Sequence, residues 1–168
     1  MTRRISRHLA VLGTLGAALL LTATTATARS GTQDRAAASA GSHASGPVGV
    51  WEGAVAIPGG EVEATMSFRS DGTLCLVAPP PGPDGGVEGA GRWVSTGQNT
   101  FSFRVTERFF DGTGATTGYL RASHSAVVHA GRFSSSGTGA FYDAGWTLLD
   151  SFTATSRMHR TSPVPTAC

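Results

Sequence analysis

The chain has 168 residues, thirteen arginines, no lysine, eleven acidic residues and a formal net charge of +2 at pH 7. Three of the arginines lie within residues 1–28, so the remaining chain carries ten arginines against eleven acidic residues and is close to neutral. Without a net basic charge or a basic cluster, the chain lacks the electrostatic signature of a nucleic-acid-binding protein, and we expect no nucleic-acid partner.

Segment 1–28 has the pattern of a secretory signal peptide. It starts with basic residues, continues with an apolar run at 9–21, and ends on Ala26-Thr27-Ala28, which matches an A-x-A cleavage site. The apolar run is too short to span a bilayer, and no second long apolar run follows. We therefore expect a secreted, extracellular protein that is cleaved after Ala28 and does not contact the membrane afterwards. The pair Arg3-Arg4 keeps twin-arginine export open as the alternative route.

Residues 29–46 are small and polar and have no apolar periodicity, which predicts a disordered Ala/Ser/Gly-rich leader. Residues 47–160 are enough for one domain with its own core, and the proline-containing end 161–168 is expected to be an irregular tail. The two cysteines, Cys75 and Cys168, either form a disulfide that ties the tail to the domain or remain separate thiols. The sequence leaves both options open, because it does not give the distance between the two residues.

The domain is divided by Gly-containing turns into short segments rich in Val, Phe, Thr and Leu, and none of them shows a helical apolar stripe. This pattern predicts an all-β fold. Because most connections have hairpin length, neighbouring strands should pair antiparallel, and closure of the sheet removes its edges. We predict an eight-stranded antiparallel up-and-down β-barrel, with a β-sandwich as the alternative. The expected strands are 48–57, 61–69, 73–78, 87–95, 100–109, 117–128, 132–142 and 146–160.

The first expected strand contains Gly49-Val50-Trp51, which resembles the Gly-x-Trp motif of lipocalins and their calycin relatives. The order of this motif, a hairpin, the sequence SDGT and a second Gly91-Arg92-Trp93 is similar to small secreted bacterial lipocalin-like barrels. The resemblance covers most of 48–160. It implies that Trp51 closes one end of the barrel beside Gly49, and that an arginine of the last strand, Arg157 or Arg160, packs over the Trp51 ring.

Alternation within two expected strands gives the candidate catalytic residues. In 100–109 the aromatic residues share one face with Glu107, and a carboxyl group among aromatic rings should have a raised pKa. In 117–128 the apolar face contains His124, so a Glu107–His124 dyad across neighbouring strands is a candidate acid–base pair. Ordinary roles at the barrel mouth or in the core are the alternatives for both residues. Tyr119 is the third candidate.

A barrel of this size holds side chains and one small ligand, and aromatic residues are typical of a small-molecule site. Plain core packing is the alternative role for each candidate liner. No Cys or His cluster has zinc spacing, so we expect no metal and no cofactor. The candidate ligand-binding residues are Trp51, Met66, Phe68, Trp93, Phe101, Phe103, Leu120 and Phe141; Tyr142 and Trp146 are further candidate liners.

Three functions follow as hypotheses. The first is a secreted barrel that binds a small, mainly apolar molecule. The second, suggested by a resemblance to allene oxide cyclase and spirotetronate-forming cyclases, is a cofactor-free cyclase or isomerase that acts by folding its substrate. The third is a protein-binding or inhibitor module that uses the proline-rich loop 79–86. The sequence leaves the ligand's identity and a homodimer open.

Overall fold

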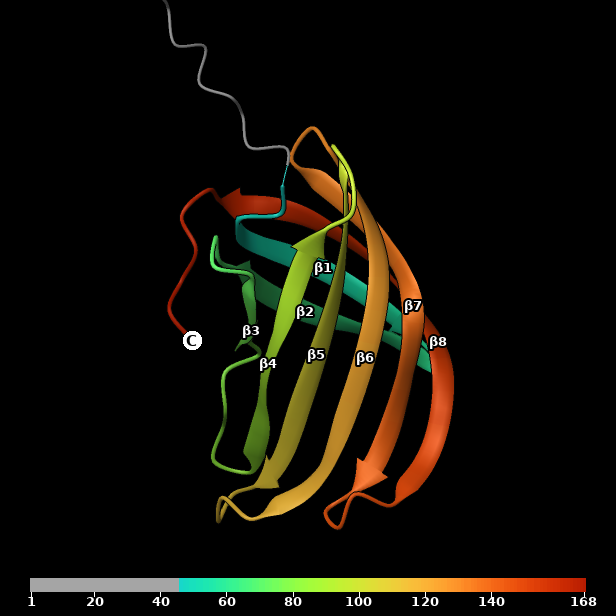
Figure 1. Ribbon diagram of the computed structural model, residues 1–168. Helices are drawn as coiled ribbons and strands as arrows, with labels where there is room; N and C mark the ends of the chain where they lie inside the picture. The colour runs from blue at the N-terminus through green and yellow to red at the C-terminus, as the bar shows by residue number, and fades with distance from the viewer. Residues whose placement is uncertain (1–45) are drawn as a thin grey trace, which may run out of the picture. The chain divides into compact units, whose positions relative to one another are not determined.

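The computed structural model describes residues 46–168; the predicted signal peptide and the predicted leader up to residue 45 lie outside the described residues. The described chain folds into eight β-strands and contains no helix (Figure 1). The strands are β1 (Gly49–Ile57), β2 (Gly60–Phe68), β3 (Thr73–Ala78), β4 (Gly85–Ser95), β5 (Thr100–Asp111), β6 (Thr116–His129), β7 (Arg132–Asp143) and β8 (Leu148–Ser162).

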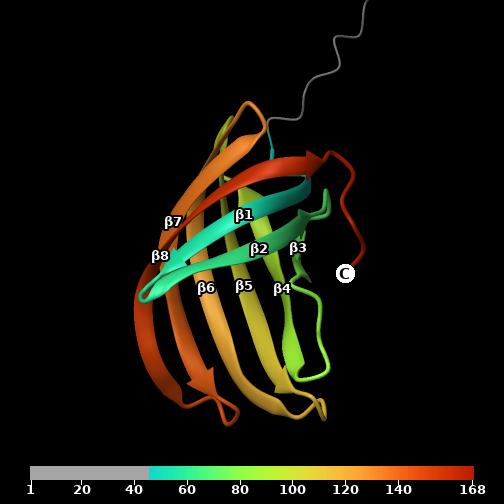
Figure 2. The ribbon, with the colours of Figure 1, turned by 180° about the vertical axis from the view of Figure 1, so that it is seen from behind.

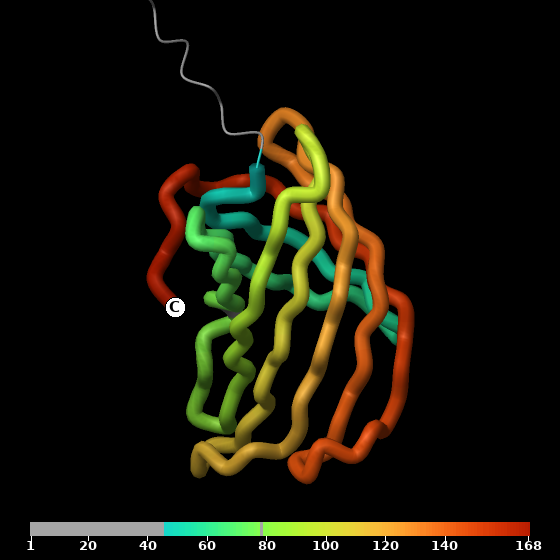
Figure 3. Tube along the Cα trace, viewed as in Figure 1, coloured from blue at the N-terminus to red at the C-terminus, as the bar shows by residue number. Residues whose placement is uncertain are grey.

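The eight strands form one closed antiparallel barrel in which each strand pairs with its neighbours in sequence. β1 pairs with β8 and closes the sheet (Figure 2), and the tube view follows the chain up and down through successive hairpins (Figure 3). The predicted up-and-down barrel is thus confirmed, and the sandwich alternative is wrong. Closure leaves no long edge strand exposed, which removes the main aggregation risk of an antiparallel sheet.

The predicted strand boundaries agree with the structure except near some hairpins. The last strand begins at Leu148 rather than at 146, because the turn before it is closed by a carboxylate. Asp143 Oδ1 accepts hydrogen bonds from the backbone N–H groups of Gly145 and Thr147, at 2.9 and 2.8 Å. Trp146 adopts a positive φ of 66° within this turn and cannot belong to a strand. β8 in turn runs to Ser162 rather than to 160.

One end of the barrel, which we call the plugged end, is filled by aromatic side chains. Trp51 and Phe68 are fully buried, and Phe101 and Phe133 are almost so. The Phe133 ring meets Trp51 edge-on at 5.0 Å and Phe101 at 5.4 Å between centroids. Edge-to-face packing of this kind stabilises each pair by about 0.5 to 1.5 kcal/mol beyond its burial. The prediction that Trp51 closes one end of the barrel agrees with this geometry.

An arginine of the last strand does lie over the Trp51 ring, but it is Arg160 and not Arg157. The Arg160 guanidinium carbon is 4.6 Å from the ring centroid, and its Nη2 donates to the Gly46 carbonyl at 2.8 Å. Inward-facing positions of β8 are even-numbered, so Arg157 points outward and is exposed. An irregularity between Val50 and Trp51 sets Arg160 opposite Trp51. Of the two arginines that the resemblance offered, Arg160 therefore has this role, and Arg157, which was expected among the structural residues, does not.

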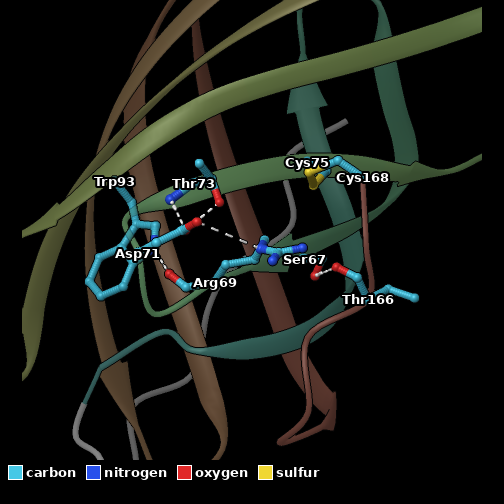
Figure 4. Close-up of polar contacts among 8 residues, drawn as sticks. All are labelled: Ser67, Arg69, Asp71, Thr73, Cys75, Trp93, Thr166 and Cys168. Carbon is cyan, nitrogen blue, oxygen red and sulfur yellow. Dashed lines mark hydrogen bonds and ion pairs between the residues drawn. A yellow bond between two sulfur atoms is a disulfide. The ribbon is translucent and has the colours of Figure 1, made fainter.

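The C-terminal tail lies along the outside of β2 and β3 and is held there covalently (Figure 4). Cys168 forms a disulfide with Cys75 of β3, with a Cα–Cα separation of 5.6 Å. Ser67 Oγ donates to the Thr166 carbonyl at 3.0 Å. The tail covers outward-facing side chains, since Ser67 is 0% and Cys75 is 2% exposed. Of the two options that the sequence left open for the cysteines, the structure has the disulfide.

The turn between β6 and β7 offers a stability test of the hairpin geometry. Its two central residues, Ala130 and Gly131, have φ values of 47° and 73°, and this combination belongs to a type I′ turn. Alanine is strained in this region, whereas Asn-Gly is the preferred pair. Ala130→Asn is expected to raise the free energy of unfolding by about 0.5 to 1 kcal/mol in urea denaturation. The matched change Ala130→Val should lower it, and equal effects of the two substitutions would contradict this turn assignment.

Candidate functional site

Beyond the aromatic plug the barrel interior holds a cavity of about 280 Å³. We call this end of the barrel, where the hairpins after β1, β3, β5 and β7 lie, the cavity end. Every strand contributes to the lining, which is mainly aliphatic and aromatic. The lining residues are Val55, Ile57, Val62, Glu63, Ala64, Met66, Leu76, Pro79, Val87, Phe103, Val105, Glu107, Phe109, Leu120, Ala122, His124, Phe141, Phe152, Ala154 and Ser156.

Inward-facing glycines let large side chains of the neighbouring strands lie close against the barrel wall in this half. Gly89 of β4 lies opposite Glu107 of β5, and a Cβ at position 89 would come within 3.0 Å of the Glu107 Cγ and of the Leu76 Cβ. Gly139 of β7 lies opposite Phe152 of β8, whose ring occupies the space of the missing side chain. The lining thus combines glycine and alanine with large aromatic rings. Small barrels commonly alternate small and large interior residues in this way.

Glu107 is the one acidic side chain that projects from the middle of a strand into the apolar lining, and Glu63 lies at the exposed edge. Among the described residues, no hydrogen bond or ion pair to the Glu107 carboxyl is formed. Burial raises the pKa of Glu107 from 4.5 to about 7, because the ionised form loses hydration and gains no partner. Near neutral pH this carboxyl is therefore able to donate a proton, accept one, or pair with a cation supplied from outside.

The raised pKa of Glu107 predicts a pH-dependent cost to stability. Between about pH 4.5 and pH 7 the folded protein keeps a proton that the unfolded chain has released, so stability is lost as the pH rises through this window. Glu107→Gln removes this titration. Its free energy of unfolding should exceed that of the wild type by about 2 to 3 kcal/mol at about pH 8 and match it below about pH 4.

Urea denaturation across this pH range measures the effect. Glu63→Gln is the matched control, because Glu63 is exposed at the cavity edge. A Glu107→Gln variant whose stability follows the wild-type pH profile would show that the Glu107 carboxyl is not desolvated.

His124 lies deeper, against the aromatic plug. Its ring stacks on Phe103 at 5.0 Å between centroids, and burial lowers its pKa, so it is neutral near pH 7. His124 Nδ1 is 2.9 Å from Ser135 Oγ, and Ser135 Oγ is 2.6 Å from Ser156 Oγ. The three side chains form a buried chain across β6, β7 and β8. Both hydrogen bonds form whichever way the two hydroxyl protons point. In the neutral imidazole ring, Nε2 accepts a hydrogen bond when Nδ1 donates, and donates when Nδ1 accepts.

The predicted Glu107–His124 dyad is not formed. In the β5–β6 register Glu107 lies opposite Leu120, and His124 lies opposite Phe103. The two groups are four positions apart along the strands, about 13 Å at the usual rise per residue. The sequence placed both residues on inward faces, and the structure agrees. The sequence did not determine the register between the two strands.

Tyr119 faces the outside of the barrel and does not belong to the cavity. It stacks on Trp146 with centroids 3.9 Å apart, and the Arg121 guanidinium lies 4.5 Å from the Trp146 ring centroid. Tyr142 joins the same external group, with its ring 5.6 Å from Trp146. The expectations that Tyr119 is a catalytic residue of the interior, and that Tyr142 and Trp146 line it, are therefore wrong. Alternation already sets Tyr119 on the face opposite to His124.

The predicted ligand-binding residues divide between the cavity and the plug. Met66, Phe103, Leu120 and Phe141 line the cavity. Trp51, Phe68 and Phe101 are packed inside the plug, where burial is nearly complete. Trp93 lies beside the plug: its Nε1 donates to the Arg69 carbonyl at 2.7 Å, and its ring is 6.4 Å from Phe101.

Several residues that line the cavity were not predicted from the sequence. Val55 and Ile57 come from β1, and Phe152, Ala154 and Ser156 from β8. All five follow period-two alternation within their strands, so the same reasoning that identified β5 applies to them. Ser135, the partner of His124, carried no such signal, because it lies in a run of three serines.

The short strand β3 leaves parts of β2 and β4 in the closed barrel without a hydrogen-bonded partner on that side. β3 pairs with only part of each neighbour, from Thr65 to Phe68 on β2 and from Gly89 to Arg92 on β4. An outer hollow beside this seam is lined by Glu52, Glu63, Ala64, Thr65 and Pro79. Glu63, Ala64 and Pro79 also line the interior cavity, so these residues lie between the outer hollow and the cavity.

Within residues 46–168, no group of three or more His, Cys, Asp or Glu side chains is arranged to hold a metal ion. The same part of the chain has no helix long and apolar enough to cross a bilayer. Comparison of the sequence and structure with protein-family models, with curated proteins and with solved structures finds no match. The geometry of the barrel and of its cavity is therefore the basis for a functional assignment.

Proposed function

We propose that the protein is a binding barrel that holds one small, mainly apolar molecule in its interior. The observation that carries this proposal is the cavity of about 280 Å³ between the aromatic plug and the cavity end. Its volume lies close to the lower bound, about 300 Å³, of typical small-molecule sites. Its lining is apolar, with a few polar groups, and this is the composition such sites have.

The finer resemblance to lipocalins belongs to the same proposal. Its support is Gly49-Val50-Trp51 at the plugged end, with an arginine of the last strand over the Trp51 ring. Export is also part of the proposal: a disulfide between Cys75 and Cys168 is typical of an oxidising compartment outside the cytoplasm. In this account the plug is a rigid floor, and the ligand enters from the cavity end or beside β3.

Native mass spectrometry of the protein secreted by an actively growing host tests the proposal. We expect a reproducible extra mass that is released on denaturation, or a one-to-one complex when decanol is added to the emptied protein. A compact protein that carries no extra mass and takes up no decanol would overturn the proposal.

Catalysis within the same cavity is the second candidate function. The observation in its favour is Glu107, an unpartnered carboxyl group with a pKa of about 7 in an apolar cavity, which suits proton transfer near neutral pH. An isomerase or cyclase of this kind would need no cofactor. Loss of turnover with retained ligand binding in Glu107→Gln would separate this function from simple binding. A role for the loop after β3 in protein recognition has less support, because Pro79 already lines the cavity.

A further inference from the structure

The cavity lining has an acidic character that limits which apolar molecules it accepts. Glu107 projects into the lining without a protein partner, and Glu63 lies at its edge. No arginine lines the cavity, and His124, its one basic group, has a lowered pKa and is neutral. A ligand with a carboxylate would place like charges together in a medium of low polarity, whereas a cation would supply Glu107 with its missing partner.

The surroundings of Glu107 suit a cationic head group. Leu120 and Phe141 lie on the same register line across β6 and β7, and Phe109 is the next inward residue of β5. The Phe109 and Phe141 rings are 6.3 Å apart between centroids. A positively charged group beside Glu107 would therefore contact the Glu107 carboxylate and aromatic faces together, which is the usual environment of bound ammonium groups.

The net charge at the cavity end has the same sign as the Glu107 carboxylate, because acidic residues outnumber arginines there. Hydrogen bonds from Thr113 to Asp111 and from Thr147 to Asp143 lower the pKa of each carboxyl group, so both stay ionised. The arginines near this end are engaged: Arg108 pairs with Glu88 at 2.7 Å, and Arg121 lies over Trp146. Further acidic residues of this end are Glu61, Asp84 and Asp150, whereas Arg69, Arg92, Arg132 and Arg160 lie toward the plugged end.

We propose that the natural occupant of the cavity is an apolar cation, an amine or quaternary ammonium on a hydrocarbon body, whose charged head pairs with the Glu107 carboxylate. This inference rests on the proposed function, since it names the chemical class of the molecule in the barrel. The acidic cavity end attracts such a molecule, and the hydrocarbon body fills the apolar lining towards Met66 and Phe103.

Calorimetric titration with three probes of equal chain length tests the inference: decyltrimethylammonium, decanol and decanoate, each below its micelle concentration. At about pH 8 we expect the ammonium probe to bind at least about tenfold more tightly than decanol, and decanoate to bind more weakly than decanol. Glu107→Gln should abolish the preference for the cation and keep decanol binding. Glu52→Gln, which changes an exposed carboxyl group on the outer face of β1, should keep the preference.

The pH dependence gives an independent readout, because the quaternary ammonium group does not titrate. Of the other titratable residues that line the cavity, Glu63 lies at its exposed edge and His124 lies toward the plug; the direct neighbours of Glu107 on β4 and β6 are Gly89 and Leu120. Affinity for the ammonium probe should rise about tenfold or more between about pH 5.5 and about pH 8 in the wild type and stay constant in Glu107→Gln. Decanol binding without a preference for the cation would overturn this inference and leave the binding barrel intact. Failure of all three probes would overturn both.

Discussion

Trp51→Ala is expected to lower the free energy of unfolding by about 3 to 5 kcal/mol, the largest loss from a single substitution in this barrel. Trp51 is completely buried and packs edge-on against Phe133. Its indole N–H donates to the Pro47 carbonyl at 2.6 Å, and Arg160 lies over its ring. The substitution opens a cavity, leaves the Pro47 carbonyl without its donor, and removes the aromatic face beneath a guanidinium that is already partly desolvated.

Trp146→Ala is the matched control for this change. Trp146 is 41% exposed in the turn between β7 and β8, and its contacts with Tyr119 and Arg121 lie on the outer surface. Its loss should cost about 1 kcal/mol or less in the same urea denaturation experiment. If both tryptophan variants lost equal stability, Trp51 would not be the centre of the aromatic plug.

Removal of the disulfide in the double variant Cys75→Ala, Cys168→Ala is expected to cost about 3 to 5 kcal/mol. The bond joins residues 93 positions apart, so it restricts the unfolded chain strongly. The variant also frees the tail that covers Ser67 on β2, where the Ser67 hydroxyl donates to the Thr166 carbonyl. Denaturation midpoints of the oxidised wild type and of the variant give the difference.

The reduced wild type is the control for the disulfide. It should unfold at nearly the same urea concentration as the double variant, because both lack the same constraint on the unfolded chain. A double variant as stable as the oxidised wild type would contradict a structural role for the link between the tail and β3.

The barrel was predictable because its strands have clear chemical periodicity. In β5, Phe101, Phe103 and Val105 are buried, whereas Arg104 between them and Thr106 after them are exposed. The turn residues divide the chain into an unbroken series of hairpins, and closure is the arrangement that protects both edges. The inward faces of β5 and β6, with Glu107 and His124 on them, followed from the same alternation.

The contacts across strands were not predictable, because they depend on register. Alternation repeats every two residues, so it gives the face of Glu107 and His124 but not their relative height in the barrel. The sequence left the choice between Arg157 and Arg160 open for a related reason. An irregularity in the β1–β8 pairing sets Arg160 opposite Trp51, and no sequence pattern marks that irregularity.

The hollow half of the barrel follows from residues that carry little sequence signal. Gly89 and Gly139 carry no signal in the sequence, yet in the structure the side chains of Glu107 and Phe152 lie where a Cβ at these positions would be. A cavity arises from the sum of side-chain volumes across all strands, and the volumes on facing strands become comparable only once the register is known. The contact between Ser135 and His124 was unpredictable for the same reason, because it also depends on the register between neighbouring strands.

Calorimetric titration of decanol into the wild type and into Ala154→Phe tests the central claim most directly. Ala154 is 5% exposed and lines the cavity, so a phenyl ring there occupies the proposed ligand site. Thr155→Phe, on the exposed outer face of β8, is the matched control. We predict one bound decanol in the wild type and in Thr155→Phe, and none in a folded Ala154→Phe. Equal binding by all three proteins, or by none of them, would contradict a ligand site inside the barrel.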